Sequence, residues 1–162
     1  MSQYMNLIGQ NAKKAALEKI NTKVKNKILN RYASLLDQER NSIIKANTKD
    51  IKFALKKRLK NNLIDRLTIN DKKLDNIKDT INKIIKLKDP IDNTLEKWSR
   101  PNGLKIKRVS IPIGVIGVIY ESRPNVTSDV ASLCFKSGNA VILKGGSEAI
   151  NTNKILAKLF RK

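Results

Sequence analysis

Residues 111–160 read IPIGVIGVIYESRPNVTSDVASLCFKSGNAVILKGGSEAINTNKILAKLF, and they define the fold class of the chain. Two runs, 111–120 and 139–144, are apolar on both faces, which is typical of buried parallel strands. Each run is followed by a polar loop and then by a segment with apolar residues at helical spacing. Strand, helix, strand and helix in this order predict a right-handed βαβ unit with one further helix.

The helix after the first strand carries signals at both ends. Thr127 or Ser128 is expected to cap its N-terminus, and Gly138 is expected to end it. Gly114 and Gly117 are expected to ease packing within the first strand. Two parallel strands make a thin sheet, so the region is interpreted as an incomplete α/β domain.

The residues before position 92 show helical periodicity instead. Thr22 and Thr48 are expected to be N-caps, and Asp89-Pro90 is expected to stop the last helix because proline cannot continue the hydrogen-bond ladder. Four segments carry the pattern, namely 8–20, the residues after Thr22, 42–57 and 71–87.

Between these regions, residues 94–111 alternate polar and apolar side chains around Arg100-Pro101-Asn102-Gly103, which predicts a β-hairpin. The hairpin has too few apolar residues to be stable alone, so it is either a surface hairpin or an arm that pairs with another element or subunit. The predicted α/β chain thus has a helical part (1–91), a hairpin arm (92–110) and a βαβα unit (111–162).

The charge of the chain is strongly positive, with 34 Lys and Arg residues against 14 Asp and Glu residues. Clustered cations favour nucleic-acid binding, so a basic nucleic-acid-binding module is one alternative. The excess is spread along the chain, however, and only 4% of residues are aromatic, which leaves few stacking platforms for bases. A solvated basic surface is the preferred interpretation.

The composition also bears on localisation. No apolar stretch approaches the roughly 20 residues of a membrane-spanning helix, and the first residues lack the zones of a secretory signal. A single cysteine, Cys134, excludes an internal disulfide. We therefore predict a cytoplasmic protein without membrane contact.

Two polar loops, 120–127 and 144–149, follow the predicted strands and should meet at the carboxyl edge of the sheet, where ligands gather in such folds. The second loop offers the Lys144 cation, two glycines, the Ser147 hydroxyl and the Glu148 carboxylate, which suit a ribose or a phosphate. The signal is weak by itself, because neither a G-x-G-x-x-G nor a Walker loop is present.

The first loop contains Arg123 and Asn125. Asn125 is either a donor to a developing oxyanion or a helix cap, and Arg123 either clamps an anion or is solvated. Cys134 lies within an apolar stretch of the following helix, and the chain has no histidine to activate it. We expect a buried structural thiol there and no metal site in the chain.

The stretch from Arg100 to Ala149 closely resembles the gamma-glutamyl phosphate reductase family of the aldehyde dehydrogenase superfamily. The segments Ile43–Asn47, Asp65–Leu67 and Asp89-Pro90 are also similar to that family. The run from Tyr120 to Thr127 separates this family from other aldehyde dehydrogenases, whose comparable loop is shorter and usually reads Pro-Trp-Asn.

The resemblance implies an enzyme that reduces L-glutamyl 5-phosphate with NADPH to glutamate 5-semialdehyde in proline biosynthesis. It assigns Asn125 to the oxyanion and Arg123 to the substrate. It assigns cofactor binding to Lys144, Gly146, Ser147 and Glu148.

The resemblance also implies a homo-oligomer built through the hairpin arm and glutamate 5-kinase as the pathway neighbour. The family's nucleophilic cysteine lies beyond the region that this chain contains. The chain is therefore expected to be an amino-terminal portion that is inactive alone, with an association-only remnant as the other alternative.

Overall fold

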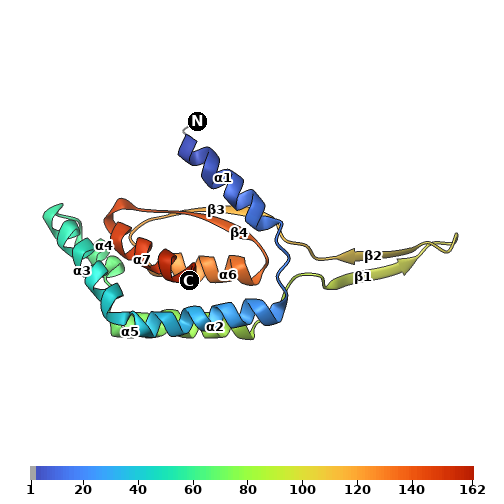
Figure 1. The fold of residues 1–162 in the computed structure, drawn as a ribbon, viewed down its shortest axis with the longest axis horizontal. Helices are drawn as coiled ribbons and strands as arrows, with labels where there is room; N and C mark the ends of the chain where they lie inside the picture. Colours follow the sequence, from blue (N-terminus) through green and yellow to red (C-terminus); the bar gives the residue numbers. More distant parts are fainter. Residues whose placement is uncertain (1–2) are drawn as a thin grey trace.

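The computed structural model describes residues 3–162. Helices dominate the first half, a long hairpin follows, and a small parallel sheet with its helices closes the chain (Figure 1). In chain order the elements are α1 (Gln3–Ala16), α2 (Thr22–Gln38), α3 (Arg40–Lys56), α4 (Asn61–Leu67), α5 (Asp71–Lys86), β1 (Thr94–Ser99), β2 (Lys105–Val109), β3 (Val115–Tyr120), α6 (Asn125–Lys136), β4 (Ala140–Gly145), the 3-10 turn η1 (Ser147–Ala149) and α7 (Ile150–Phe160).

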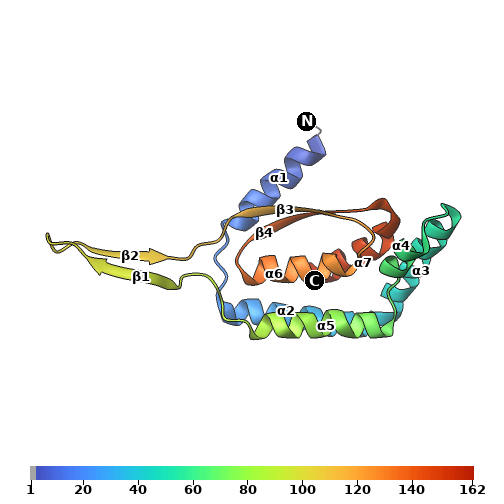
Figure 2. The same ribbon diagram turned by 180° about the vertical axis from the view of Figure 1, so that it is seen from behind.

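The elements form layers. Helices α2 and α5 lie side by side at the base, α6 lies between them and the β3–β4 sheet, and α1 crosses the opposite face of that sheet (Figures 1 and 2). The β1–β2 hairpin projects away from these layers. Among the described residues, no helix is long and apolar enough to cross a membrane.

The predicted βαβ unit is present. Strands β3 and β4 pair in parallel from Val115 opposite Ala140 to Tyr120 opposite Gly145, with α6 as the connection. Strands β1 and β2 pair antiparallel around the predicted turn, in which Gly103 has a φ of 83°. A positive φ of this size favours glycine, so the Pro-Asn-Gly signal was interpreted correctly.

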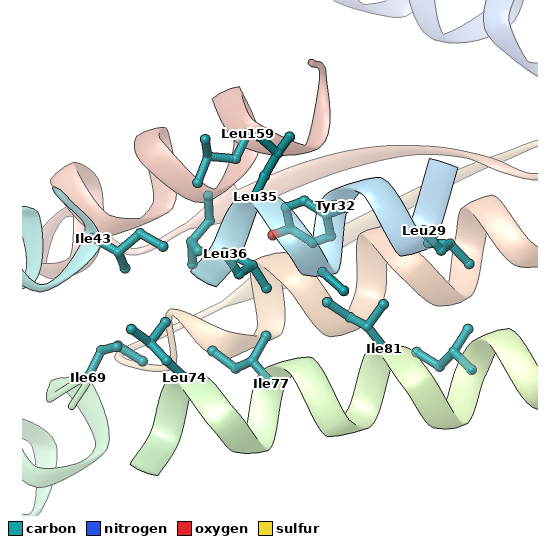
Figure 3. Close-up of a cluster of buried hydrophobic side chains, with 13 residues drawn as sticks. Leu29, Tyr32, Leu35, Leu36, Ile43, Ile69, Leu74, Ile77, Ile81 and Leu159 are labelled. Carbon is teal, nitrogen blue, oxygen red and sulfur yellow. The ribbon is translucent and has the colours of Figure 1, made fainter. Parts of the chain in front are cut away.

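The main core lies between α2, α5 and the helices of the βαβα unit (Figure 3). Tyr32 is central to it, because its ring packs edge-on against Phe160 and its hydroxyl lies 2.6 Å from the hydroxyl of Ser128. The apolar face predicted for α5 is buried there, with Leu74, Ile77, Ile81 and Ile84 all at most 4% exposed. This face therefore joins the helical part to the α/β part.

Several predicted helix ends are wrong. Asn21, not Thr22, caps α2 by accepting a hydrogen bond from the Val24 N–H, and the Thr22 hydroxyl donates to Asp89 instead. Thr48 lies inside the continuous helix α3, where its hydroxyl donates to the carbonyl of Ile44. Both predicted threonine caps are therefore wrong: Thr22 has a tertiary partner, and Thr48 bonds back to the preceding turn, as a hydroxyl within a helix can.

Two other helix predictions also need correction. The first helix runs over Gln3–Ala16 rather than 8–20 and buries no residue. Helix α6 begins at Asn125, so Thr127 and Ser128 lie inside it and are buried rather than capping it. Its predicted end is correct. Gly138 has a φ of 70°, and the Gly138 and Asn139 N–H groups donate to Phe135 and Cys134, which is a Schellman motif.

Strand β3 is not buried on both faces as its apolar run predicted. Its residues alternate in exposure, and Ile119 is 78% exposed. Ile111 and Ile113, which precede the strand, are also exposed. One face of β3 thus remains open to solvent in this chain.

Candidate functional site

The two polar loops after β3 and β4 lie next to each other, and Glu148 joins them. Its Oε1 atom accepts hydrogen bonds from the backbone N–H of Ser122 at 2.6 Å and from the Ser122 hydroxyl at 3.1 Å. Ser122 is buried and has a φ of 40°, which is an uncommon conformation for a residue with a side chain. The Glu148 carboxylate therefore stabilises a strained turn in the neighbouring loop.

The ionised form of Glu148 is favoured by these contacts. Partial burial acts to raise its pKa, but hydrogen bonds from its own backbone N–H and from Ser122 outweigh this effect and lower the pKa overall. The carboxylate is thus charged at neutral pH, and its Oε2 atom is not used by Ser122. A ribose hydroxyl could donate to that oxygen.

The glycines of the second loop lie close to two side chains that a larger residue would have to displace. A Cβ atom at Gly146 would collide with the carboxylate of Glu148, and one at Gly145 would collide with the Asn153 amide. These contacts are internal to the protein. The glycines therefore leave room for the Asn153 amide and the Glu148 carboxylate in their observed positions.

A buried carboxylate fixes the start of α7, directly after this loop. Asp50 of α3 is 1% exposed and accepts hydrogen bonds from the N–H groups of Asn151 and Thr152. The side chains of the same two residues also donate to it, the Thr152 hydroxyl at 2.6 Å. These helix N–H groups are occupied, so they cannot bind a phosphate as a helix start often does.

The second loop is therefore better suited to a ribose than to a phosphate. Lys144 and Ser147 are exposed at the carboxyl end of β4, beside the partly buried Glu148. They offer an ammonium group and a hydroxyl next to a fixed carboxylate. This set of donors and acceptors fits the hydroxyl groups of a nucleotide sugar.

Asn125 occupies the first position of α6 and faces α5. Its side-chain amide donates to the Oδ2 atom of Asp129 at 2.9 Å, so its side chain does not cap the helix. Both residues line a pocket of about 230 Å³, together with Arg66, Lys73 and Thr80 from the α4–α5 side. Arg123 is exposed on the loop and does not line this pocket.

Cys134 is buried in α6 and is a free thiol. Burial raises its pKa, which disfavours the reactive thiolate. This environment agrees with a structural thiol. Among residues 3–162, no group of histidine, cysteine and acidic side chains is arranged to hold a metal ion.

Sequence reasoning missed Asp50, Ser122 and Asp129. Asp50 lies 101 positions before Asn151, at the start of the helix that it holds. The contact of Asp129 with Asn125 could have been predicted, since Asp129 follows Asn125 by four positions and therefore lies on the same face of the helix. No pattern in the sequence indicated the contact of Ser122 with Glu148.

The chain is similar in sequence to known enzymes. No model of a known protein family matches the chain. The gamma-glutamyl phosphate reductase of Halothermothrix orenii is 50% identical over 143 residues, which cover 88% of this chain and 34% of that protein. The enzyme of the same name from Hydrogenobaculum sp. is 51% identical over 90% of this chain and 33% of its own length.

Solved structures give the same result. The crystal structure of gamma-glutamyl phosphate reductase from Thermotoga maritima superposes with a TM-score of 0.91 at 42% identity, covering 94% of this chain and 37% of that one. The Saccharomyces cerevisiae enzyme gives a TM-score of 0.91 at 34% identity, over 99% of this chain and 41% of that one.

A Bacillus subtilis protein named for the aldehyde dehydrogenases shares the fold at a TM-score of 0.66 and 19% identity. At that identity the similarity shows the fold alone. The present chain spans about one third of the length of the curated relatives that it matches. In sequence and in fold, the chain is thus similar to gamma-glutamyl phosphate reductases over about one third of their length.

Proposed function

We propose that this chain forms part of an enzyme that reduces L-glutamyl 5-phosphate to L-glutamate 5-semialdehyde, with NADPH as the reductant. The observation that carries this proposal is the match of sequence and fold to gamma-glutamyl phosphate reductases over almost the whole chain. A kinase that phosphorylates the side-chain carboxylate of glutamate, such as glutamate 5-kinase, would supply the substrate. We place the enzyme in the cytoplasm.

The loop after β4 is the proposed contact with the cofactor. Lys144 and Glu148 would hold the ribose hydroxyls, with Ser147 beside them and Gly146 allowing close approach of the backbone. NADPH would supply the hydride when bound. The contact between Glu148 and Ser122 supports this role, because it fixes the carboxylate before any ligand arrives.

Asn125 is the proposed oxyanion donor. An amide NH₂ group has two hydrogens, so one can donate to Asp129 while the other is directed at an acyl oxygen. Its place at the first position of a 12-residue helix adds the positive end of the helix dipole. Arg123, exposed on the preceding loop, is proposed to contact the anionic substrate.

The nucleophile is proposed to come from outside this chain, because Cys134 is buried and burial raises its pKa, which disfavours the reactive thiolate. A cysteine thiolate in the remaining two thirds of the reductase would attack the acyl carbon and release phosphate, forming a thioester. Hydride addition to that thioester and loss of the thiolate would give the aldehyde. The present chain would supply the oxyanion donor and part of the cofactor site.

The hairpin is proposed to be an oligomerisation arm. It projects from the body, and Lys97 and Lys107 lie directly opposite each other on it. Opposed like charges destabilise an isolated hairpin, so a partner subunit that supplies carboxylates would stabilise this one. Trp98, which is 39% exposed and opposite Ile106, would add apolar contact.

A fusion protein tests the function. Residues 1–162 of this chain are joined to the remaining two thirds of the Thermotoga maritima enzyme, and we call the product the fusion reductase. We expect phosphate-dependent oxidation of glutamate 5-semialdehyde with formation of NADPH, and restored growth of a proline auxotroph that lacks its own reductase. The unfused chain should be inactive. A folded fusion reductase without activity would contradict the proposal.

A further inference from the structure

The pocket between α5 and α6 contains charged groups that the oxyanion role of Asn125 does not use. Asp129 lies in its wall and Arg66 and Lys73 lie on the opposite side. The pocket thus combines one carboxylate with two cations. Its volume of about 230 Å³ is below the roughly 300–1,000 Å³ typical of drug-sized ligands, so it suits a small molecule.

One oxygen of Asp129 makes no hydrogen bond to any of residues 3–162. Its Oδ2 atom accepts a hydrogen bond from Asn125, while Oδ1 is inaccessible to solvent and, within residues 3–162, makes no hydrogen bond. An unpaired buried carboxylate oxygen costs free energy. A ligand in the pocket would satisfy it once the Asp129 side chain turns this oxygen toward the pocket. Burial also raises the pKa of Asp129, and the Asn125 contact only partly offsets that effect.

The two cations differ in how they are engaged. The ammonium group of Lys73 donates to the backbone carbonyl of Asp65, which fixes it at the α4–α5 junction. Arg66 is exposed and forms no ion pair within the part of the chain that the structure describes. A guanidinium group presents paired donors that match a carboxylate in bidentate geometry.

The Asp129 carboxylate and the Arg66 guanidinium line the same pocket, and together they are complementary to the zwitterionic head of an α-amino acid. We propose that Asp129 recognises the α-ammonium group of the substrate and that Arg66 binds its α-carboxylate. This inference rests on the proposed function and extends it to the choice among acyl phosphates. Asp129 would thereby place the substrate beside Asn125, to which it is hydrogen-bonded.

The first test uses the 162-residue chain and L-glutamate as the probe. In ¹H–¹⁵N NMR spectra, L-glutamate at millimolar concentrations should shift the side-chain amide signals of Asn125, and glutarate, which lacks the ammonium group, should shift them much less. Asp129→Asn should abolish this difference. Asp79→Asn, which removes an exposed carboxylate elsewhere on α5, should preserve it. Equal shifts by both ligands, or none by either, would overturn the proposal.

The second test compares two substrates of the fusion reductase, glutamate 5-semialdehyde and 5-oxopentanoate, which lacks the α-amino group. Asp129→Asn should lower kcat/KM for the amino-bearing substrate about 10- to 100-fold, as loss of a charge-assisted hydrogen bond implies. The value for 5-oxopentanoate should fall far less, and Asp129→Glu should recover part of the preference. An equal fall for both substrates would make Asp129 a positioning residue for Asn125 and refute ammonium recognition.

These tests separate the inference from the proposed function. A fusion reductase without activity, combined with selective glutamate binding by the 162-residue chain, would contradict the reductase function and support the pocket. An active fusion reductase with no preference between the two aldehydes would support the reductase function and contradict ammonium recognition in the pocket. Melting temperatures of all variants, measured in parallel, show that a lost preference does not come from unfolding.

Discussion

Replacing Asp50 by alanine should destabilise the chain more than any change at an exposed carboxylate. Asp50 accepts four hydrogen bonds from Asn151 and Thr152 at the start of α7. Asn151 is exposed, so water can replace the partner that it loses. Thr152 is fully buried, and its N–H and hydroxyl would be left without an acceptor.

The magnitude follows from those two buried groups. Each stranded donor costs about 1–3 kcal/mol, so the free energy of unfolding should fall by about 2–6 kcal/mol. For a chain of this length, 1 kcal/mol corresponds to about 2–4 °C in melting temperature. Asp50→Asn should lower the free energy of unfolding less than Asp50→Ala does, because the side-chain amide keeps one oxygen that accepts hydrogen bonds. Some loss should remain, because its NH₂ group cannot accept from the other donors.

Equilibrium denaturation in urea, followed by circular dichroism, measures the effect. Asp79→Ala is the matched control, because Asp79 is exposed on α5, and it should change the free energy of unfolding by at most about 0.5 kcal/mol. If Asp50→Ala lowered the free energy of unfolding no more than Asp79→Ala does, the stabilising role of the Asp50 carboxylate would be refuted. In the fusion reductase, the same change should also weaken NADPH binding, since α7 follows the cofactor loop directly.

Further outcomes follow from the loops and the core. Gly146→Ala should displace the Glu148 carboxylate and weaken NADPH binding by the fusion reductase, as measured by fluorescence titration. Because the folded-state pKa of Glu148 lies below its ordinary value, its carboxylate stabilises the fold above that ordinary value. This stabilisation is lost as the pH falls through the lowered pKa, so the stability gap between wild type and Glu148→Gln should close on acidification. In the fusion reductase, Asn125→Ala should reduce turnover by about 100- to 1000-fold, and Lys144→Ala should mainly weaken cofactor binding. Ile81→Ala, at a fully buried position, should cost about 2–5 kcal/mol in urea denaturation.

Local signals in the sequence predicted the elements that local physics controls. The apolar spacing of α5, the Pro-Asn-Gly turn and the glycine at position 138 each act within a few residues, and each was interpreted correctly. Asn21 and Thr22 show the limit of such signals. Two adjacent residues could both cap, and only the tertiary contact of Thr22 with Asp89 distinguishes them.

The parts that were missed depend on contacts between distant segments. Asp50 looks like an ordinary surface carboxylate within the lysine-rich helix α3 until α7 is brought against it. The open face of β3 was missed for a different reason. Its apolar residues, such as Ile119, are typical of a strand covered on both sides, and sequence alone does not reveal what covers it in a given chain.

The open face of β3 and the net charge of the chain act in opposite directions on the association of its copies. The exposed side chains of Ile113 and Ile119 favour hydrophobic association between copies, while electrostatic repulsion from a formal charge of +20 opposes it. The screening length falls from about 30 Å at 0.01 M salt to about 8 Å at 0.15 M. Added salt should therefore promote association of the purified chain, and light scattering at low and at physiological ionic strength measures this.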